Sequence, residues 1–350
     1  MKDATTSSLS LRAGEWVEIR TKEEILATLD SNGRLDELPF MPEMLRHCGK
    51  RMQVSKRAHK TCDPALGIGG RKMARTVHLE NVRCDGSAHD GCEAGCLIFW
   101  KDAWLKRVDS EDASTGTALP VAGLGCKEDA LWSAVKVLDS IDEAGPAYMC
   151  QNTQIKFATQ PLAWWDARQY VEDYTSGNVK LSQLAAGFLF SVVRALAEAG
   201  IGFGYAIRWT YDAFQRAIGG SPYPLRPYGV VPGIPTPKLL LDLQEGEIVR
   251  VKPFREILKT LNSDYRNRGM YFDAEMVLFS DRDFKVYKRL KRIIDERTSK
   301  MVHFKSDAIV LDNVVCEARY AKCRRFCPRA IYPFWREIWL ERVSPGSDNV

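Results

Sequence analysis

The chain of 350 residues contains ten cysteines, and six of them form two groups of three. The first group is Cys84, Cys92 and Cys96, and the second is Cys316, Cys323 and Cys327. Thiolates are soft anionic ligands, so several of them close together are typical of zinc sites and of iron–sulfur clusters. Packing alone does not explain why such a spacing occurs twice. We therefore interpret the two groups as two metal sites.

The spacing within the first group favours an iron–sulfur cluster. Seven residues separate Cys84 from Cys92, and three of them are glycine or alanine, which lets the backbone wrap around an ion or a cluster. Zinc ribbons use Cys-x-x-Cys pairs, and this sequence has none. We expect a 4Fe–4S cluster, with zinc as the alternative. Cys62 is the predicted fourth ligand, and His89 could replace one of the thiols.

The second group lacks an equivalent fourth ligand, because Ile294 stands where Cys62 stands in the first. We predict that Cys150 completes this site, and Cys126 or His303 could do so instead. A cluster with three cysteines would leave one iron open to a substrate, as catalytic metal sites leave a position open. The third alternative is that one of the two sites is purely structural.

The region around each group is repeated 232 positions apart. Glu24-Ile25-Leu26 recurs as Glu256-Ile257-Leu258, and Cys84 falls on Cys316. A match that keeps one register this long predicts an internal duplication. In the first copy we expect short strands and one-turn helices that form a small, bent β-barrel, over residues 14–20, 23–29, 42–48, 51–55 and 76–80.

The strand that opens each copy carries a recognisable pattern. It reads Gly14-Glu15-Trp16-Val17-Glu18-Ile19 in the first copy and Gly246-Glu247-Ile248-Val249-Arg250-Val251 in the second. This pattern resembles the SH3-like barrels of the KOW type found in translation and transcription proteins. The combination with cysteines and tryptophans is also similar to a set of uncharacterised bacterial proteins. The resemblance implies tandem SH3-like modules in a bacterial protein.

The material between the copies is different in kind. Residues 127–142 have the apolar spacing of an amphipathic helix, and residues 184–198 that of a longer helix. Charged residues interrupt the apolar run, so we expect a buried helical hairpin and no membrane span. The predicted fold is α+β with three domains: a first module over 1–109, a linker and helical middle domain over 110–237, and a second module over 238–350.

Two tryptophan pairs follow the cysteine groups. Trp100 and Trp104, like Trp335 and Trp339, stand four residues apart, the spacing of neighbours on a helix, and we expect them to shield the clusters from water. The second module is basic: residues 246–343 hold 22 Lys and Arg against 14 Asp and Glu. A basic barrel with aromatic residues could bind nucleic acid through phosphate contacts.

The N-terminal residues lack the apolar core of a secretion signal, so we expect a cytoplasmic protein, in which cysteines serve as ligands rather than as disulfides. Walker, His-Glu-x-x-His and Gly-x-Ser-x-Gly motifs are missing. The prediction is a metalloprotein, iron–sulfur in type, with a redox or biosynthetic role on a small molecule or an electron-transfer partner. The alternative is a non-catalytic factor that binds nucleic acid or protein and has structural zinc sites.

Overall fold

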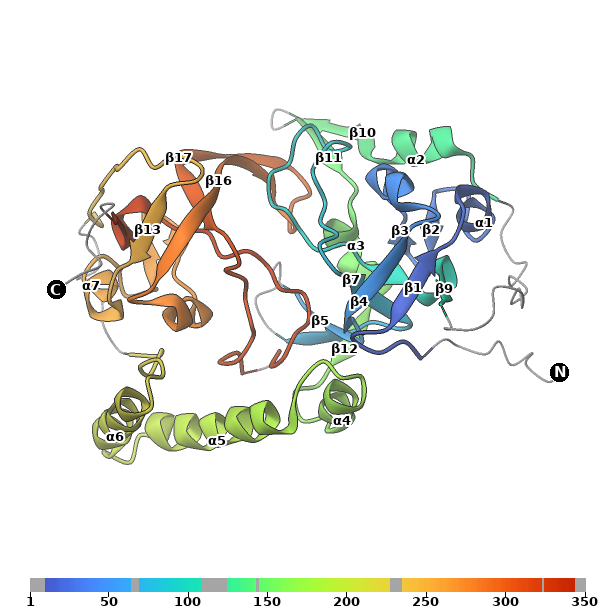
Figure 1. Ribbon diagram of the computed structural model, residues 1–350. Helices are drawn as coiled ribbons and strands as arrows, with labels where there is room; N and C mark the ends of the chain where they lie inside the picture. Colours follow the sequence, from blue (N-terminus) through green and yellow to red (C-terminus); the bar gives the residue numbers. More distant parts are fainter. Residues whose placement is uncertain are drawn as a thin grey trace. The chain divides into compact units, whose positions relative to one another are not determined.

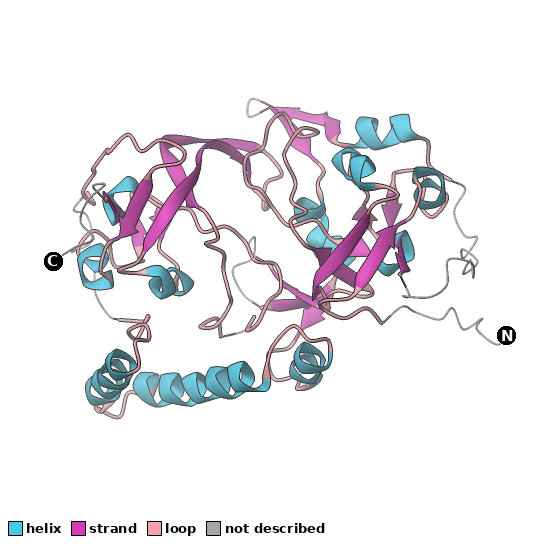
Figure 2. Ribbon diagram, in the orientation of Figure 1, coloured by secondary structure: helices cyan, strands magenta, loops and turns pink. Residues whose placement is uncertain are grey.

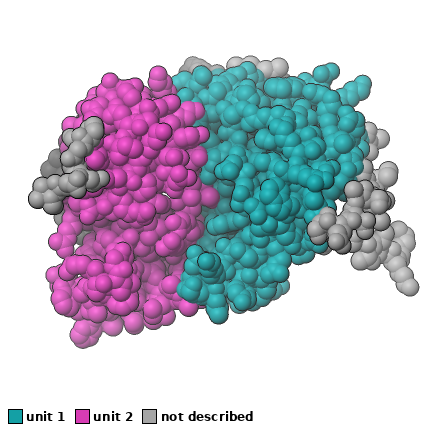
Figure 3. Space-filling view, in the orientation of Figure 1, with its two compact units in different colours: residues 1–184, 292–303, 326–329 teal, residues 185–291, 304–325, 330–350 magenta. Residues whose placement is uncertain are grey.

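The structure is a computed structural model that describes residues 10–63, 69–108, 125–142, 145–226, 235–322 and 324–343. It combines helices with several antiparallel sheets, so the expected α+β class is confirmed (Figure 1, Figure 2). The chain divides into two compact units, coloured separately in Figure 3. The first unit holds residues 1–184, 292–303 and 326–329, and the second holds the remainder.

A five-stranded sheet is the frame of the first unit. Its order is β8-β7-β4-β1-β9, and it is formed by β1 (Trp16–Ile19), β4 (Arg51–Arg57), β7 (Thr76–Leu79), β8 (Trp100–Lys101) and β9 (Leu105–Arg107). Between β1 and β4 lie α1 (Lys22–Leu26), the hairpin of β2 (Arg34–Leu35) and β3 (Leu38–Pro39), and the 3₁₀ turn η1 (Pro42–His47). The strands and the first helix therefore form where apolar alternation and spacing predicted them.

Local sequence explains these elements. Val17 and Ile19 alternate with more exposed residues, so β1 buries one face. Thr21 caps α1 and forms a capping box with Glu24, which satisfies two free N–H groups at the helix start. The core is completed by Trp104, whose indole N–H donates to Thr28 at 3.1 Å.

The first unit continues through a second set of elements that carries part of the site. A three-stranded sheet of order β12-β6-β5 is formed by β5 (Lys60–Cys62), β6 (Gly70–Lys72) and β12 (Gln160–Leu162). Helix α3 (Gln151–Ala158) directly precedes β12 in the chain, and helix α4 (Arg168–Thr175) follows it.

Two predictions about helices are wrong here. The expected helix over 127–142 ends as α2 (Glu128–Ala134), and the chain continues as β10 (Lys136–Asp142), paired with β11 (Gly145–Tyr148). Pairing with a neighbouring strand outweighs the helical spacing. Trp100 lies in strand β8 and Trp104 ends the 3₁₀ turn η2 (Asp102–Trp104), so the two tryptophans do not share a helix.

The second unit is built around a four-stranded sheet of order β17-β16-β13-β18. Its elements are β13 (Ile248–Val251), α7 (Phe254–Leu258), β14 (Arg266–Asn267), β15 (Met270–Tyr271), η3 (Ala274–Phe279), β16 (Asp283–Ile294), β17 (Met301–Leu311), η4 (Glu337–Trp339) and β18 (Leu340–Arg342). They occur in the same order as the elements from β1 to η1 and from η2 to β9. The outer ends of β16 and β17, residues 292–303, belong to the first unit.

The same core contacts occur within each of the two units. The rings of Phe40 and Trp104 lie 5.1 Å apart at 84°, and those of Phe272 and Trp339 lie 5.2 Å apart at 82°. Trp339 donates to Thr260 at 2.9 Å, as Trp104 does to Thr28. A residue of one unit can therefore be compared with the residue at the equivalent position of the other.

Helices α5 (Leu181–Glu198) and α6 (Gly204–Ala217) follow α4, as the lower part of Figure 1 shows. The prediction that this hairpin is buried is wrong, because only 22% of α5 is buried. By length and composition alone, α5 could cross a membrane. The side chains of Phe188, Leu189 and Leu196 are exposed, since periodicity predicts an apolar stripe but not what covers it.

Candidate metal centre

Four cysteines of the first unit line one cavity of about 50 Å³. Cys84, Cys92 and Cys96 come from the predicted first group, and Cys150 comes from the residue before α3. The wall between them is mainly apolar and includes Met41, Leu97, Ile98 and Ile294. The space is larger than a single water molecule requires, so the cavity could hold an inorganic group.

The loop that carries the first three thiols depends on a close backbone approach. The N–H of Cys84 donates to the carbonyl of Cys96 at 2.8 Å, which closes the loop. Gly86 adopts a φ of +73°, and a Cβ there would lie 1.9 Å from the carbonyl oxygen of Cys92. Only glycine fits this position, so the glycines of the seven-residue gap bring Cys84 and Cys92 together.

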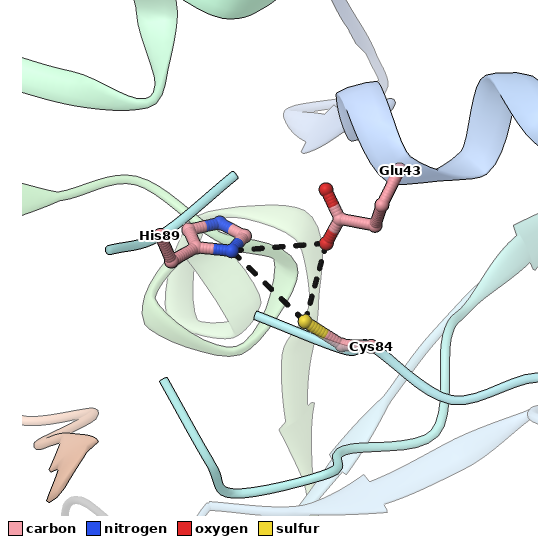
Figure 4. Close-up of side chains that lie close together, drawn as sticks. All are labelled: Glu43, Cys84 and His89. Atoms are coloured by element: carbon pink, nitrogen blue, oxygen red, sulfur yellow. Dashed lines mark hydrogen bonds and ion pairs between the residues drawn. The ribbon is translucent and has the colours of Figure 1, made fainter. Parts of the chain in front are cut away.

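Cys84 also belongs to a compact group with Glu43 and His89 (Figure 4). The Cys84 thiol lies 3.2 Å from Glu43 Oε1 and 4.0 Å from His89 Nδ1, and the latter two atoms are 3.7 Å apart. All three candidate ligand atoms lie within 4.8 Å of one another. Glu43 Oε2 and His89 Nε2 are buried without a hydrogen-bond partner. Unpartnered polar atoms are costly in a protein interior, which indicates a binding site.

Backbone N–H groups point at several of the sulfur atoms. The N–H of Ile294 donates to Cys92 Sγ at 3.3 Å. Cys84 accepts from the N–H of Gly86, and Cys150 from those of Thr153 and Asn152. Such donors stabilise a thiolate more than a neutral thiol. These N–H groups therefore favour the thiolate, which is the form of cysteine that binds a metal.

Burial acts in the opposite direction on the same thiols. It raises the pKa of Cys84 and Cys96 well above the usual range, and that of Cys150 to about 11. Neighbouring charges raise these pKa values further, among them Cys96 acting on Cys84 and Cys92 acting on Cys150. Four thiolates therefore need positive charge among them, which a bound metal supplies while the thiol protons leave.

Two other cysteines of the first unit, Cys62 and Cys327, lie together. The N–H of Cys62 donates to Cys327 Sγ at 3.2 Å, and both residues are buried. Arg329, which is also buried, lies 3.9 Å from Cys62 Sγ and forms an ion pair with Glu296. The nearby charges of Glu296, Cys62 and Cys96 raise the pKa of the Arg329 guanidinium.

The structure groups the cysteines differently from the prediction. Cys62 was assigned to the first group and lies beside Cys327 instead, whereas Cys150 was assigned to the second group and lines the cavity of the first. Cys316 is in the second unit, and Cys323 lies outside the described residues. The exchange has a physical reason, because tertiary packing and not sequence separation decides which single cysteine approaches each group.

Other predicted or overlooked residues can also be placed. Cys126 is buried elsewhere, next to Gly33, and donates to the carbonyl of Lys127. The tryptophans pack in the core and are not among the residues lining the cavity. Sequence reasoning did not single out Glu43, although its match with Glu275 in the repeat was a usable signal.

Glu275 occupies the position of Glu43 in the second unit and has a different role there. It accepts hydrogen bonds from the N–H groups of Arg319, Tyr320 and Ala321. Burial raises the pKa of Glu275 to about 7. A carboxylate that holds a loop in one unit therefore faces a thiol and an imidazole in the other.

Comparisons with protein-family models, with curated proteins and with solved structures found no match.

Proposed function

We propose that the protein is an iron–sulfur protein whose first cluster is held by Cys84, Cys92, Cys96 and Cys150. The observation that carries the proposal is the convergence of these four thiols on one largely apolar cavity. Sulfur atoms that accept backbone N–H groups are suited to ligation, because second-shell donors orient and stabilise a thiolate ligand.

The spacing of the thiols supports a cluster over a single zinc ion. Zinc binds sulfur at about 2.3 Å, so a tetrahedral site places its sulfur atoms about 3.8 Å apart. Cys84, Cys96 and Cys150 do not form a group whose ligand atoms all lie within 4.8 Å of one another. A cluster binds each cysteine through a different iron atom and so accepts a wider arrangement.

A second candidate rests on the group of Glu43, Cys84 and His89. Their ligand atoms are close enough for one ion, and three protein ligands with an open fourth position are typical of catalytic zinc. This zinc site would share Cys84 with the proposed cluster, so one chain could not hold both at once. The two candidates differ in whether Cys150 or Glu43 is indispensable.

Residues around the cavity would tune a cluster. Bound there, a 4Fe–4S cluster would supply one-electron transfer to a small molecule or to a protein partner. Arg329 places a buried positive charge near Cys96, which balances part of the negative charge of the thiolates. The apolar wall keeps water away, and both features affect reduction potential.

We also infer that the two units contain copies of one module, of the SH3-like type. The equal order of elements and the matching Phe–Trp–Thr contacts support this. In this proposal Cys62 and Cys327 are ligands of the second site, and Cys150 serves the first. The cytoplasmic, bacterial setting is part of the same proposal.

Absorption and EPR spectra of three variants, purified without oxygen, test the cluster. Cys150→Ser should abolish the contribution of the first cluster to the spectrum, whereas Glu43→Gln should leave most of it. Cys126→Ser is the matched control, because Cys126 is a buried thiol outside the cavity. Loss of metal from Glu43→Gln together with full retention in Cys150→Ser would refute the cluster and establish the zinc site.

A further inference from the structure

The second unit contains a cavity of about 350 Å³ whose charged residues are all basic. It is lined by Lys238, Arg268, Lys305 and Arg336, together with Thr236, Ser306 and Pro235. No carboxylate is among these lining residues. Within the described part of the chain, Lys238, Arg268 and Lys305 form no ion pair. No carboxylate of the cavity's own lining therefore balances its positive charges.

In the first unit, the residues at the equivalent positions form an ion pair. Lys101 forms an ion pair with Asp36, with 2.9 Å between Nζ and Oδ2, and also approaches the carbonyl of Ala74 at 3.4 Å. Asp36 stands in the turn between β2 and β3, at a φ of +50°. The Lys101 side chain is 3% exposed, and a carboxylate balances its charge.

The second unit keeps the cation and reverses the charge of its partner. Arg336 takes the place of Lys101 and donates to the carbonyl of Ser306 at 2.9 Å, as Lys101 does to Ala74. Arg268 takes the place of Asp36, in the turn between β14 and β15, at a φ of +46°. The ion pair of the first unit has thus become a pair of like charges in the second.

The like charges of Arg268 and Arg336 repel each other unless an anion binds between them. Burial, and then the charge of Arg268, lower the pKa of Arg336. Arg336 Nε is buried without a hydrogen-bond partner, and the Nη1 and Nη2 groups each donate one hydrogen bond, to the carbonyls of Ser306 and Arg268. Like charges held together in a hollow stabilise a bound anion and are themselves stabilised by it.

We propose that this cavity binds the phosphate groups of a phosphorylated small molecule, such as a nucleotide. Guanidinium groups match the geometry of phosphate oxygens, and lysines add point charges at the rim. Ser306 and Thr236 add hydroxyl donors; the Thr236 oxygen already accepts the N–H of Arg268 at 2.8 Å, which leaves its own proton for a ligand. The volume is in the range of small-molecule sites.

Calorimetric titration of the full-length, metal-loaded protein tests the proposal. Tripolyphosphate, a nucleoside triphosphate and a single-stranded oligonucleotide are the probes. Arg268→Asp reproduces the ion pair of the first unit, so it should weaken binding of the first two probes by about tenfold or more while the fold is retained. Lys285→Asp changes net charge equally on an exposed strand position outside the cavity, and should change affinity by less than about twofold.

The outcomes separate the sources of the phosphate. Equal affinity for tripolyphosphate and the nucleotide assigns the site to phosphate alone, and tighter binding of the nucleotide assigns it to a nucleotide. Absence of saturable binding by both would overturn the proposal. So would equal weakening by Arg268→Asp and Lys285→Asp, or binding of the oligonucleotide only, because these results indicate diffuse surface charge.

Discussion

The backbone N–H of Cys62 donates a hydrogen bond to Cys327 Sγ, 3.2 Å away, across 265 positions of the chain. This contact ties the end of the second cysteine group to strand β5 of the first unit. Cys62 lies beside Cys327 and is not among the residues that line the cavity. The cavity thiols then have Cys150 as their fourth member.

The first prediction concerns this division of ligands. Cys62→Ser should remove metal from the second site only and leave the cluster of the cavity, whereas Cys150→Ser should do the reverse. Metal analysis and absorption spectra of the two variants measure the difference. Loss of the same metal from both variants would mean that Cys62 and Cys150 serve one site.

The second prediction concerns the loop from Cys84 to Cys96. Gly86→Ala places a Cβ against the carbonyl of Cys92 at a positive φ, so it should lower the free energy of unfolding by more than about 1 kcal/mol and reduce metal content. Gly49→Ala is the control, because Gly49 has a φ of +76° and no atom near its Cβ position. It should cost about 1 kcal/mol and leave metal bound. Equal metal content in the two variants would contradict the role given to Gly86.

The third prediction is a pH dependence of stability. Asp102 is buried, neither of its carboxylate oxygens has a hydrogen-bond partner, and burial raises its pKa to about 6. The unfolded value is about 3.9, so the folded state binds the proton more tightly and loses stability as pH rises from about 4 to about 6. Asp102→Asn should therefore stabilise the protein by about 2 kcal/mol at pH 8 and have little effect at pH 3.

Glu337 is the matched control for this effect. It holds the position of Asp102 in the second unit, but its longer side chain accepts the N–H groups of Leu241, Asp242 and Leu243. Glu337→Gln should destabilise by about 1–3 kcal/mol, because it weakens charge-assisted bonds. Urea denaturation across the pH range measures both variants, and destabilisation by Asp102→Asn at pH 8 would count against the account.

The fourth prediction concerns the charge of Arg329. Replacement by methionine removes a buried cation near Cys96 and Cys62 and leaves Glu296 without its ion pair. Adding an electron to the cavity site then becomes less favourable, so the reduction potential should fall. Potentiometric titration of Arg329→Met against Arg342→Met, whose arginine is exposed and paired with Glu247, isolates the effect. An unchanged potential would show that the arginine acts only on folding.

Sequence patterns predicted the features that depend on near neighbours. Three such features each span only a few residues: the alternation around Val17, the apolar spacing of α1 and the thiols of the first group. The structure has strand β1 and helix α1 where the first two predicted them. The partners of Cys62 and Cys150 depend on how distant segments pack, and no local pattern records that. Residues 136–142 show the same limit, since strand pairing overrides helical spacing.

Repetition within the chain carried information that single residues did not. Glu43 was visible only as a match to Glu275, and the reversal from Asp36 to Arg268 has meaning only because Lys101 and Arg336 hold equivalent places. Exposure of α5 lay beyond sequence reasoning, because an apolar stripe looks the same whether or not protein covers it.

Iron and acid-labile sulfide content, measured on protein purified without oxygen, tests the central claim most directly. Cys62→Ser isolates the first site. In that variant the account predicts about four iron and about four sulfide per chain, with a brown colour that Cys150→Ser removes. A colourless protein that binds zinc without sulfide, and loses it on Glu43→Gln, would contradict the cluster.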